Sequence, residues 1–268
     1  MPFILVRDIQ MYYEVRGKGP HLMFISGTGG DLKRRPKVFN HSIAERFEIL
    51  AFDQRRLGQT NKPDAPYTMF DYAADAAALL EELSWKSCLV MGLSFGGMVA
   101  QEFALRYPKR VEKLVLACTS SGGAGGASYP LHELLLGTPL RERAVSIIEL
   151  LDTRYDKAWQ NNHPRQFKVI IDQSVSRWKL IEDEPLRVMG LRRQLEARMH
   201  HDTYDLLPYL QLPVFICGGK YDAISPPENL RALQDQIPNS KLKLFEGGHG
   251  FLLQDQRAYP SIINFLLK

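Results

Sequence analysis

Short apolar runs alternate along this chain with longer amphipathic segments. The runs predict β-strands at 21–25, 48–52, 87–91, 113–118, 213–217 and 241–245. The Ala- and Leu-rich segment 72–83 and the segment 257–267 predict helices. Continuous apolar strands that alternate with helices are typical of a parallel sheet covered on both faces. Residues 9–15 alternate loosely before a turn at 17–20, which predicts an antiparallel start.

This rhythm breaks at the glycine-rich stretch 120–126. Beyond it, helical patterns recur at 141–151, 165–178 and 185–199, without a convincing buried strand. We therefore predict two units, a core of residues 1–126 and 208–268 and a helical cap lobe of residues 127–207. The glycines are expected to give the lobe a flexible entry.

Composition excludes several classes of protein. The 268 residues include 34 basic and 30 acidic ones, a net charge of +4, and these are mixed along the chain without the basic stripe of a nucleic-acid-binding protein. The arginines of 127–207 could suit an acidic substrate, but are more simply explained as surface side chains. No apolar run is long enough to span a membrane.

Cysteine usage and the first residues indicate the compartment. Cys88, Cys118 and Cys217 lie in apolar runs, and neither disulfide-framework nor metal-ligand spacing is present. Residues 1–8 hold no basic leader, and their apolar stretch is too short for a signal peptide. We expect a cytoplasmic protein with no membrane or nucleic-acid partner.

The segment 89–97 carries the strongest chemical signal. An apolar run leads into Gly92-Leu93-Ser94-Phe95-Gly96, and a helix-forming stretch follows. This strand–turn–helix context is that of a nucleophile elbow, in which a sharp turn exposes a serine hydroxyl and glycines relieve crowding on both sides. Ser94 is therefore the candidate nucleophile.

A serine nucleophile needs a base, and the base needs an acid that orients it. Such groups collect beyond the carboxyl ends of the strands of open α/β sheets. Asp222 follows the strand at 213–217, and His249 follows the strand at 241–245 between glycines. The chain order Ser94, Asp222, His249 is the order typical of hydrolases with this elbow. Taken singly, each could be a structural residue.

Acyl transfer also needs two N–H donors for the oxyanion. The backbone N–H of Phe95 is the first candidate, and the loop after the first parallel strand, residues 26–30, supplies the second. We predict Thr28, with Gly27 as the alternative. A phosphate-binding loop is disfavoured because no P-loop lysine follows in register.

Together these motifs resemble the α/β-hydrolase superfamily, and more narrowly its small bacterial esterases, enol-lactonases and cofactor-free haloperoxidase-like hydrolases. The resemblance covers nearly the whole chain. It implies an α/β-hydrolase fold, a mostly parallel central sheet with helices on both faces and an inserted helical cap. Many relatives carry His-Gly where this chain has Ser26-Gly27, and usually glycine where it has Arg56; enol-lactonase-like members also lack that histidine. Asp53 is taken as structural.

The expected function is a serine hydrolase of a small ester or lactone that uses no cofactor and no metal. A carbon–carbon bond or thioester hydrolase of the same fold remains an alternative, as does a ligand receptor without turnover. Four large side chains of the cap segment could line the pocket or form the core of the cap: Trp159, Phe167, Trp178 and Met189. The oligomeric state stays open.

Overall fold

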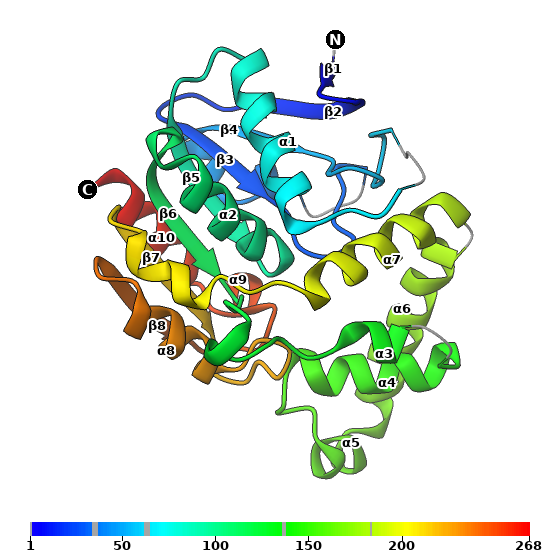
Figure 1. Ribbon diagram of the computed structural model, residues 1–268. Helices are drawn as coiled ribbons and strands as arrows, with labels where there is room; N and C mark the ends of the chain where they lie inside the picture. Colours follow the sequence, from blue (N-terminus) through cyan, green and yellow to red (C-terminus); the bar gives the residue numbers. More distant parts are fainter. Residues whose placement is uncertain (1, 34–36, 62–64, 136–137, 183) are drawn as a thin grey trace.

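A computed structural model describes residues 2–33, 37–61, 65–135, 138–182 and 184–268. Its centre is an eight-stranded sheet with the order β1-β2-β4-β3-β5-β6-β7-β8 (Figure 1). The strands are β1 (Phe3–Val6), β2 (Ile9–Arg16), β3 (His21–Ile25), β4 (Glu48–Phe52), β5 (Cys88–Leu93), β6 (Val111–Ala117), β7 (Val214–Gly219) and β8 (Ser240–Phe245). Strands β3 to β8 pair in parallel, whereas β1 and β2 are antiparallel. The prediction of a mostly parallel sheet is confirmed.

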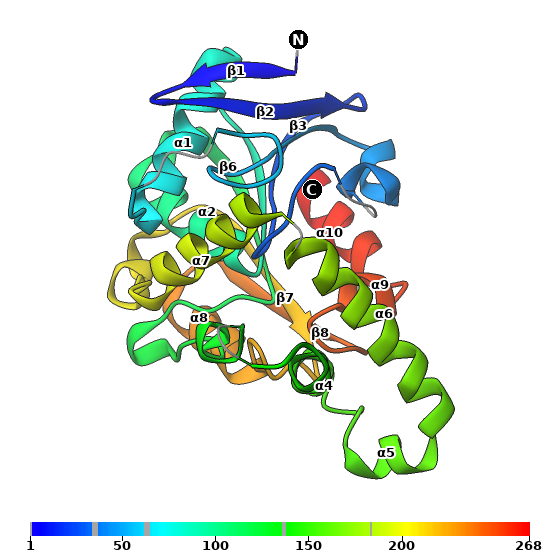
Figure 2. The ribbon, with the colours of Figure 1, turned by 90° about the vertical axis from the view of Figure 1, so that its right-hand side faces the viewer.

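Helices cover both faces of this sheet, as Figures 1 and 2 show. One face carries α1 (Met69–Glu82), α2 (Phe95–Arg106) and α8 (Pro227–Gln236), and the other carries α9 (Phe251–Gln254) and α10 (Ala258–Leu267). Successive side chains of a strand point to opposite faces. Val90 accordingly packs in the core under α1 and α2, and Met91 in the core under α10. Both faces of the inner strands are therefore shielded from water, which explains their continuous apolar runs. The edge strand β8 alternates instead and exposes Lys241 and Lys243.

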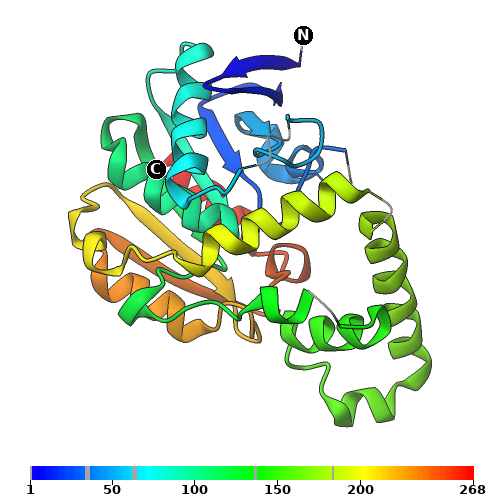
Figure 3. The same ribbon diagram turned by 45° about the vertical axis from the view of Figure 1, so that its right-hand side comes forward.

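Between β6 and β7, where the sequence predicts the cap, the described residues form five α-helices. They are α3 (Leu131–Leu135), α4 (Leu140–Leu151), α5 (Lys157–Asn162), α6 (Pro164–Glu182) and α7 (Pro185–Met199). Figure 3 shows that α5 and α6 lie well away from the sheet, while α7 returns over the loops of the core. Gly190 of α7 sits so close to the loop after β4 that a Cβ there would lie 2.1 Å from the carbonyl oxygen of Arg56. The division of the chain at 127 and 207 stays a prediction.

The glycine-rich stretch is packed, which differs from the flexible entry that we expected. Ser120, Ser121 and Gly125 are buried, and Ser121 accepts a backbone hydrogen bond from Thr203 (2.8 Å). Gly122 has a positive φ of 72° and lies so close to the chain at His201 that no side chain would fit. The glycines thus allow two backbone segments to approach closely, and they end the β6 loop in a tight turn.

Each helix of the described residues is too short or too polar to cross a lipid bilayer.

Gly96 is predicted to be essential for the packing of α2 against β3. A Cβ at this position would lie 2.1 Å from the carbonyl oxygen of Ile25, which is rigid backbone. Overpacking of this kind destabilises a protein by about 1–3 kcal/mol, and we expect Gly96→Ala to reach the upper end of this range. The melting temperature should then fall by roughly 6–10 °C.

Gly250→Ala is the matched control for thermal unfolding. The nearest atom to a Cβ at Gly250 is 3.8 Å away, an ordinary van der Waals contact. Its melting temperature should stay within about 2 °C of that of the unmodified protein. Equal melting temperatures for the two variants would contradict the packing argument.

Candidate active site

Ser94 lies at the sharp turn between β5 and α2, in a backbone conformation that side chains rarely adopt. Its φ is 54° and its ψ is −118°. The surroundings hold this strained conformation: the Ser94 N–H donates to the carbonyl of Ala117 (2.8 Å), and its carbonyl accepts from the N–H of Gly97 (2.7 Å). A Cβ at Gly92 would lie 2.3 Å from the carbonyl oxygen of Gly96, so the turn excludes larger residues. These are the features of the predicted nucleophile elbow.

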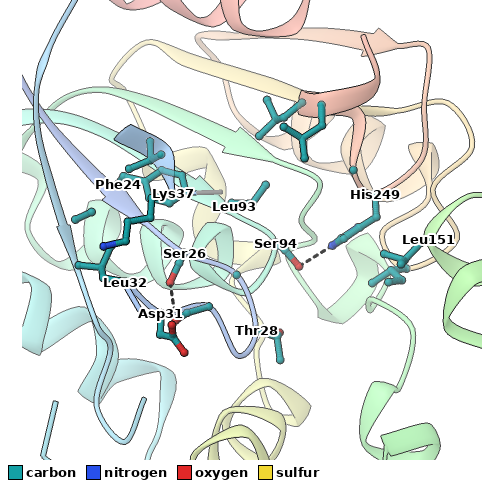
Figure 4. Close-up of a pocket in the computed structure, with 18 of the residues that line it drawn as sticks. Phe24, Ser26, Thr28, Asp31, Leu32, Lys37, Leu93, Ser94, Leu151 and His249 are labelled. Carbon is teal, nitrogen blue, oxygen red and sulfur yellow. Dashed lines mark hydrogen bonds between the residues drawn. The ribbon is translucent and has the colours of Figure 1, made fainter. Parts of the chain in front are cut away.

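The structure brings Ser94, His249 and Asp222 into one chain of hydrogen bonds. Ser94 Oγ lies 3.0 Å from His249 Nε2, a contact drawn in Figure 4. His249 Nδ1 lies 2.7 Å from Asp222 Oδ2. Both distances are within the range of a direct hydrogen bond. The three side chains, predicted from separate loops, therefore have the connectivity of a nucleophile, a base and an orienting acid.

Asp222 is held rigidly behind the histidine. The carboxyl group is buried, and its Oδ1 accepts the backbone N–H groups of Ile224 (2.8 Å) and Ser225 (3.0 Å). The second oxygen is left for His249. Because backbone N–H groups hold Oδ1, the carboxyl group cannot turn, and Oδ2 stays aimed at the ring. The imidazole is thereby held with its Nδ1–H towards the acid and its Nε2 lone pair towards Ser94.

A contact that sequence reasoning missed positions the histidine loop. The backbone N–H of His249 donates to the carbonyl of Leu151, at the end of cap helix α4 (2.6 Å). Gly248 permits this approach, since a Cβ there would lie 1.9 Å from the same carbonyl oxygen. The cap segment thus takes part in placing the base. Nothing in the local sequence near 151 signals such a contact.

The loop after β3 passes directly beside the nucleophile. A Cβ at Gly27 would lie 3.4 Å from Ser94 Cβ, and Thr28 borders the same cavity (Figure 4). Phe95 is the first residue of α2, so its N–H is one of the terminal donors without a partner inside the helix. Thr28 and Phe95 are therefore close to the place where an oxyanion would form, and their roles as donors stay a prediction.

Two residues of α7 hold this loop, and neither was predicted. Gln194 Oε1 accepts the N–H of Gly29 (2.7 Å), and Arg187 donates to the carbonyl of Gly29 (3.1 Å). Arg187 also pairs with Asp31 at 2.7 Å, and both side chains are buried. Helix α7 of the cap segment therefore holds the backbone of the expected oxyanion loop at Gly29. Arg187 corrects the expectation that the arginines of this segment are surface side chains.

Replacing Gln194 with leucine is expected to lower kcat about 10-fold with little change in KM. The substitution removes the acceptor for the Gly29 N–H, a bond worth about 1–1.5 kcal/mol, and lets the loop shift. An oxyanion loop acts on the transition state more than on the bound substrate, so the loss should appear in kcat. The control is Gln211→Leu, at an exposed position outside the cavity. An unchanged kcat in Gln194→Leu would show that α7 does not position the loop.

A cavity of about 470 Å³ opens above Ser94 and His249. Its lining is mainly apolar, with Phe24, Leu32, Val38, Leu93, Leu131, Ile147, Leu151, Trp178, Leu191, Ile224, Leu252 and Leu253. Of the four large cap side chains considered from the sequence, only Trp178 is among the residues that line it. Trp159 and Phe167 instead pack against each other in the cap, with ring centroids 6.5 Å apart.

The charged groups at the edge of this cavity have partners. Lys37 binds Glu14 (2.8 Å), and Asp31 binds Arg187. The cavity therefore suits an uncharged, largely apolar ligand, because the ion pairs already balance these charges.

Asp53, taken as structural, lies fully buried beneath the site. Burial raises its pKa to about 6. Its Oδ1 accepts the N–H of Leu32 (2.6 Å) and its Oδ2 that of Gln59 (2.8 Å), so the carboxyl group ties two loops together.

Cys118, Asp222 and His249 form a group whose potential metal-ligand atoms lie within 4.8 Å of one another. Both ring nitrogens of His249 are already engaged, by Asp222 and by Ser94. Burial raises the pKa of the Cys118 thiol, which disfavours the thiolate that metals bind. A metal would have to break the chain of hydrogen bonds, so these residues fit proton transfer better.

Comparisons with known proteins agree with the fold. A poly(3-hydroxyalkanoate) depolymerase of Ectopseudomonas oleovorans is 29% identical over 94% of this chain and 87% of the relative. The crystal structure of the enol-lactonase from Burkholderia xenovorans LB400 matches with a TM-score of 0.78 at 21% identity, over 100% of both chains. A thermophilic esterase from Thermogutta terrifontis matches with a TM-score of 0.72 at 25% identity, over 98% of this chain and 97% of the other.

The family model described as alpha/beta hydrolase fold matches residues 20–256, which include the elbow, the acid loop and the histidine loop. The predicted resemblance and fold class are thereby confirmed. This chain belongs to the alpha/beta hydrolase family.

Proposed function

We propose that this protein is a serine hydrolase that cleaves small carboxylic esters or lactones through an acyl-enzyme intermediate. The observation that carries the proposal is the continuous chain of hydrogen bonds from Ser94 through His249 to Asp222 at the floor of an apolar cavity. A serine hydroxyl is a weak nucleophile unless a base takes its proton, and His249 Nε2 lies where this transfer would occur.

In the first half of the reaction, Ser94 Oγ attacks the substrate carbonyl carbon while its proton passes to His249 Nε2. The carbonyl oxygen becomes an oxyanion, which the N–H groups of Phe95 and Thr28 would stabilise. The buried carboxylate of Asp222 stabilises the imidazolium that forms. His249 then returns the proton to the alcohol oxygen as the carbon–oxygen bond breaks, and the alcohol leaves.

In the second half, His249 takes a proton from water, and the hydroxide attacks the acyl-enzyme. The resulting tetrahedral species collapses, the bond to Ser94 Oγ breaks, and His249 gives the proton back to Ser94. The product is a carboxylic acid, and the side chains return to their starting protonation states. In a lactone both products remain one molecule, a hydroxy acid.

Esters and lactones fit the cavity better than charged substrates do. Its lining is apolar, and Lys37 and Asp31 at its edge are paired. The names of the depolymerase and esterase relatives, which describe ester cleavage, support the same class of substrate. A thioester or a diketone carbonyl could undergo the same attack, so the substrate panel below includes both.

Covalent labelling tests the proposal directly. A fluorophosphonate probe should label the purified protein at Ser94, and Ser94→Ala should abolish labelling. The matched control is Ser87→Ala, at a half-buried serine that bonds Glu112 at the other end of β5. Absence of labelling in correctly folded protein would refute the proposal that Ser94 is the nucleophile.

A substrate panel then separates the possible reactions. It comprises p-nitrophenyl esters from acetate to octanoate, lactones, thioesters and a vinylogous diketone, and we expect the highest kcat/KM for an ester or lactone. A higher value for the thioester or diketone would reassign the substrate. Tight binding of these compounds with negligible turnover would instead indicate a receptor.

A further inference from the structure

A second cavity, of about 240 Å³, lies between the glycine-rich loop and the end of α7. Its lining comprises Met98, Ser120, Gly122, Gly123, Ala127, Ser128, Tyr129, Pro130, His132, Arg198, Met199 and His201. None of these residues lines the cavity above Ser94. Gly123, Ala127, Pro130 and Met199 are exposed at its rim, whereas Ser120, Arg198 and His201 are buried at its floor. A small molecule could therefore enter from solvent.

Arg198 is a buried cation for which the described residues supply no counter-ion. Its side chain belongs to a residue that is only 9% exposed, and its Nη2 donates to the carbonyl of Tyr129 (3.3 Å). Nη1 is buried and has no hydrogen-bond partner among the described residues. No ion pair of the described part of the chain includes this guanidinium, and burial lowers its pKa to about 10. A buried charge in this situation is destabilising unless an anion joins it.

His201 follows Arg198 by one turn and supplies an unused acceptor. Nε2 lies 3.2 Å from the carbonyl oxygen of Ser120, which can only accept, so Nε2 carries the proton and donates. Burial lowers the pKa of His201 to about 4, which leaves the ring neutral at pH 7. Nδ1 is therefore a lone-pair acceptor, and it too is buried without a hydrogen-bond partner in the part of the chain that the structure describes.

The serine hydroxyls of the cavity bond one another or a neighbouring serine. Ser120 Oγ bonds Ser128 Oγ (2.8 Å), which in turn bonds Ser225 Oγ (3.0 Å). Arg198 Nη1 offers a charged donor and His201 Nδ1 offers an acceptor, and neither atom has a hydrogen-bond partner among the described residues. The complementary ligand is a small molecule that carries both a negative charge and a hydroxyl group.

We propose that this cavity binds a small anion that carries a hydroxyl group, a short hydroxycarboxylate. Its carboxylate would accept from Arg198 Nη1, and its hydroxyl would donate to His201 Nδ1. The volume of the cavity is below the range of about 300–1,000 Å³ that is typical of drug-sized ligands, which favours a molecule of only a few carbon atoms. The site is separate from the proposed hydrolytic site and does not depend on its chemistry.

Isothermal titration of the full chain tests the proposal. The probes are sodium lactate and sodium 3-hydroxybutyrate, which differ in the spacing of the two groups, with propionate and butyrate as the matched anions without a hydroxyl. At constant ionic strength we expect at least one hydroxy acid to bind, and its matched anion to bind about 10-fold more weakly. Failure of both hydroxy acids to bind would overturn the proposal.

Variants locate the binding. Arg198→Met keeps the length of the side chain but removes the charge, and should weaken binding about 10-fold or more. Without ligand its melting temperature should equal or exceed that of the unmodified protein, because a buried unpaired charge is gone. Arg192→Gln is the control, at an exposed arginine of α7 that pairs with Glu196. Unchanged binding in Arg198→Met would place the ligand elsewhere, for instance above Ser94, and overturn the proposal.

A second pair of variants changes only the rim of the cavity and leaves its buried residues unaltered. Met199 is 53% exposed at the rim, so Met199→Glu should fold normally and repel an incoming anion. Its affinity for the hydroxy acid should fall several-fold, while the neutral variant Met199→Gln retains it. Equal affinities in these two variants would contradict entry of the anion at this rim.

Discussion

Replacing Ser94 with alanine is expected to lower kcat for the best ester by about 10⁶-fold, the loss seen when an acting nucleophile is removed from a triad. The hydroxyl lies 3.0 Å from the base, where it can lose its proton and form the acyl-enzyme. Substrate binding should change little, since the apolar lining of the cavity remains. Steady-state kinetics with p-nitrophenyl esters measures the loss.

The variants His249→Ala and Ser94→Ala/His249→Ala provide the control for this prediction. Residues that act as a unit show strongly non-additive effects, so the double variant should be about as inactive as either single variant. Multiplied losses would mean that the two residues act independently. Residual activity of Ser94→Ala within about 100-fold of the unmodified protein would exclude a covalent serine mechanism.

The second large effect is expected for Asp222→Asn, which should lower kcat by about 10⁴-fold while the fold persists. The asparagine oxygen can still accept the N–H groups of Ile224 and Ser225. Its amide would donate to His249 Nδ1, however, which moves the ring proton to Nε2. The base would then present an N–H to Ser94 and could not accept the hydroxyl proton.

Two measurements check this explanation. The melting temperature of Asp222→Asn should remain within a few degrees of that of the unmodified protein, because the backbone hydrogen bonds are kept. The control is Asp255→Asn, a buried carboxylate that bonds the Glu246 N–H and lies outside the chain of hydrogen bonds at Ser94. Its kcat should stay within a few-fold. Equal kinetic losses in the two variants would show that Asp222 acts only through stability.

Local pattern and spacing were enough to predict the core of the fold and the three side chains that meet at Ser94. The apolar runs predicted the parallel strands because a strand covered on both faces needs apolar residues at every position. Ser94 could be predicted because its turn requires small residues at fixed offsets, and Asp222 and His249 because parallel strands deliver the residues after them to one edge of the sheet. These requirements are local or topological, and they restrict which residue types can occur at nearby positions of the sequence.

The contacts that the cap segment makes with the core could not be predicted from the sequence. The pattern of α7 indicates a helix, but not that Gln194 holds Gly29 or that Arg187 pairs with Asp31. Likewise, Trp178 lines the cavity whereas Trp159 does not, although both are aromatic residues in helices. The helical repeat shows which residues share a face, and says nothing of what this face will pack against.

The sequence by itself thus determined the sheet, the nucleophile elbow and the order of the three candidate catalytic side chains, because each follows from short-range backbone geometry or from strand order. Only the tertiary structure decided how the cap segment holds the loops of the site, and that Arg198 is buried with no counter-ion among the described residues. Burial of a long polar side chain depends on the helices and loops that close over it, and these come from positions far apart along the chain.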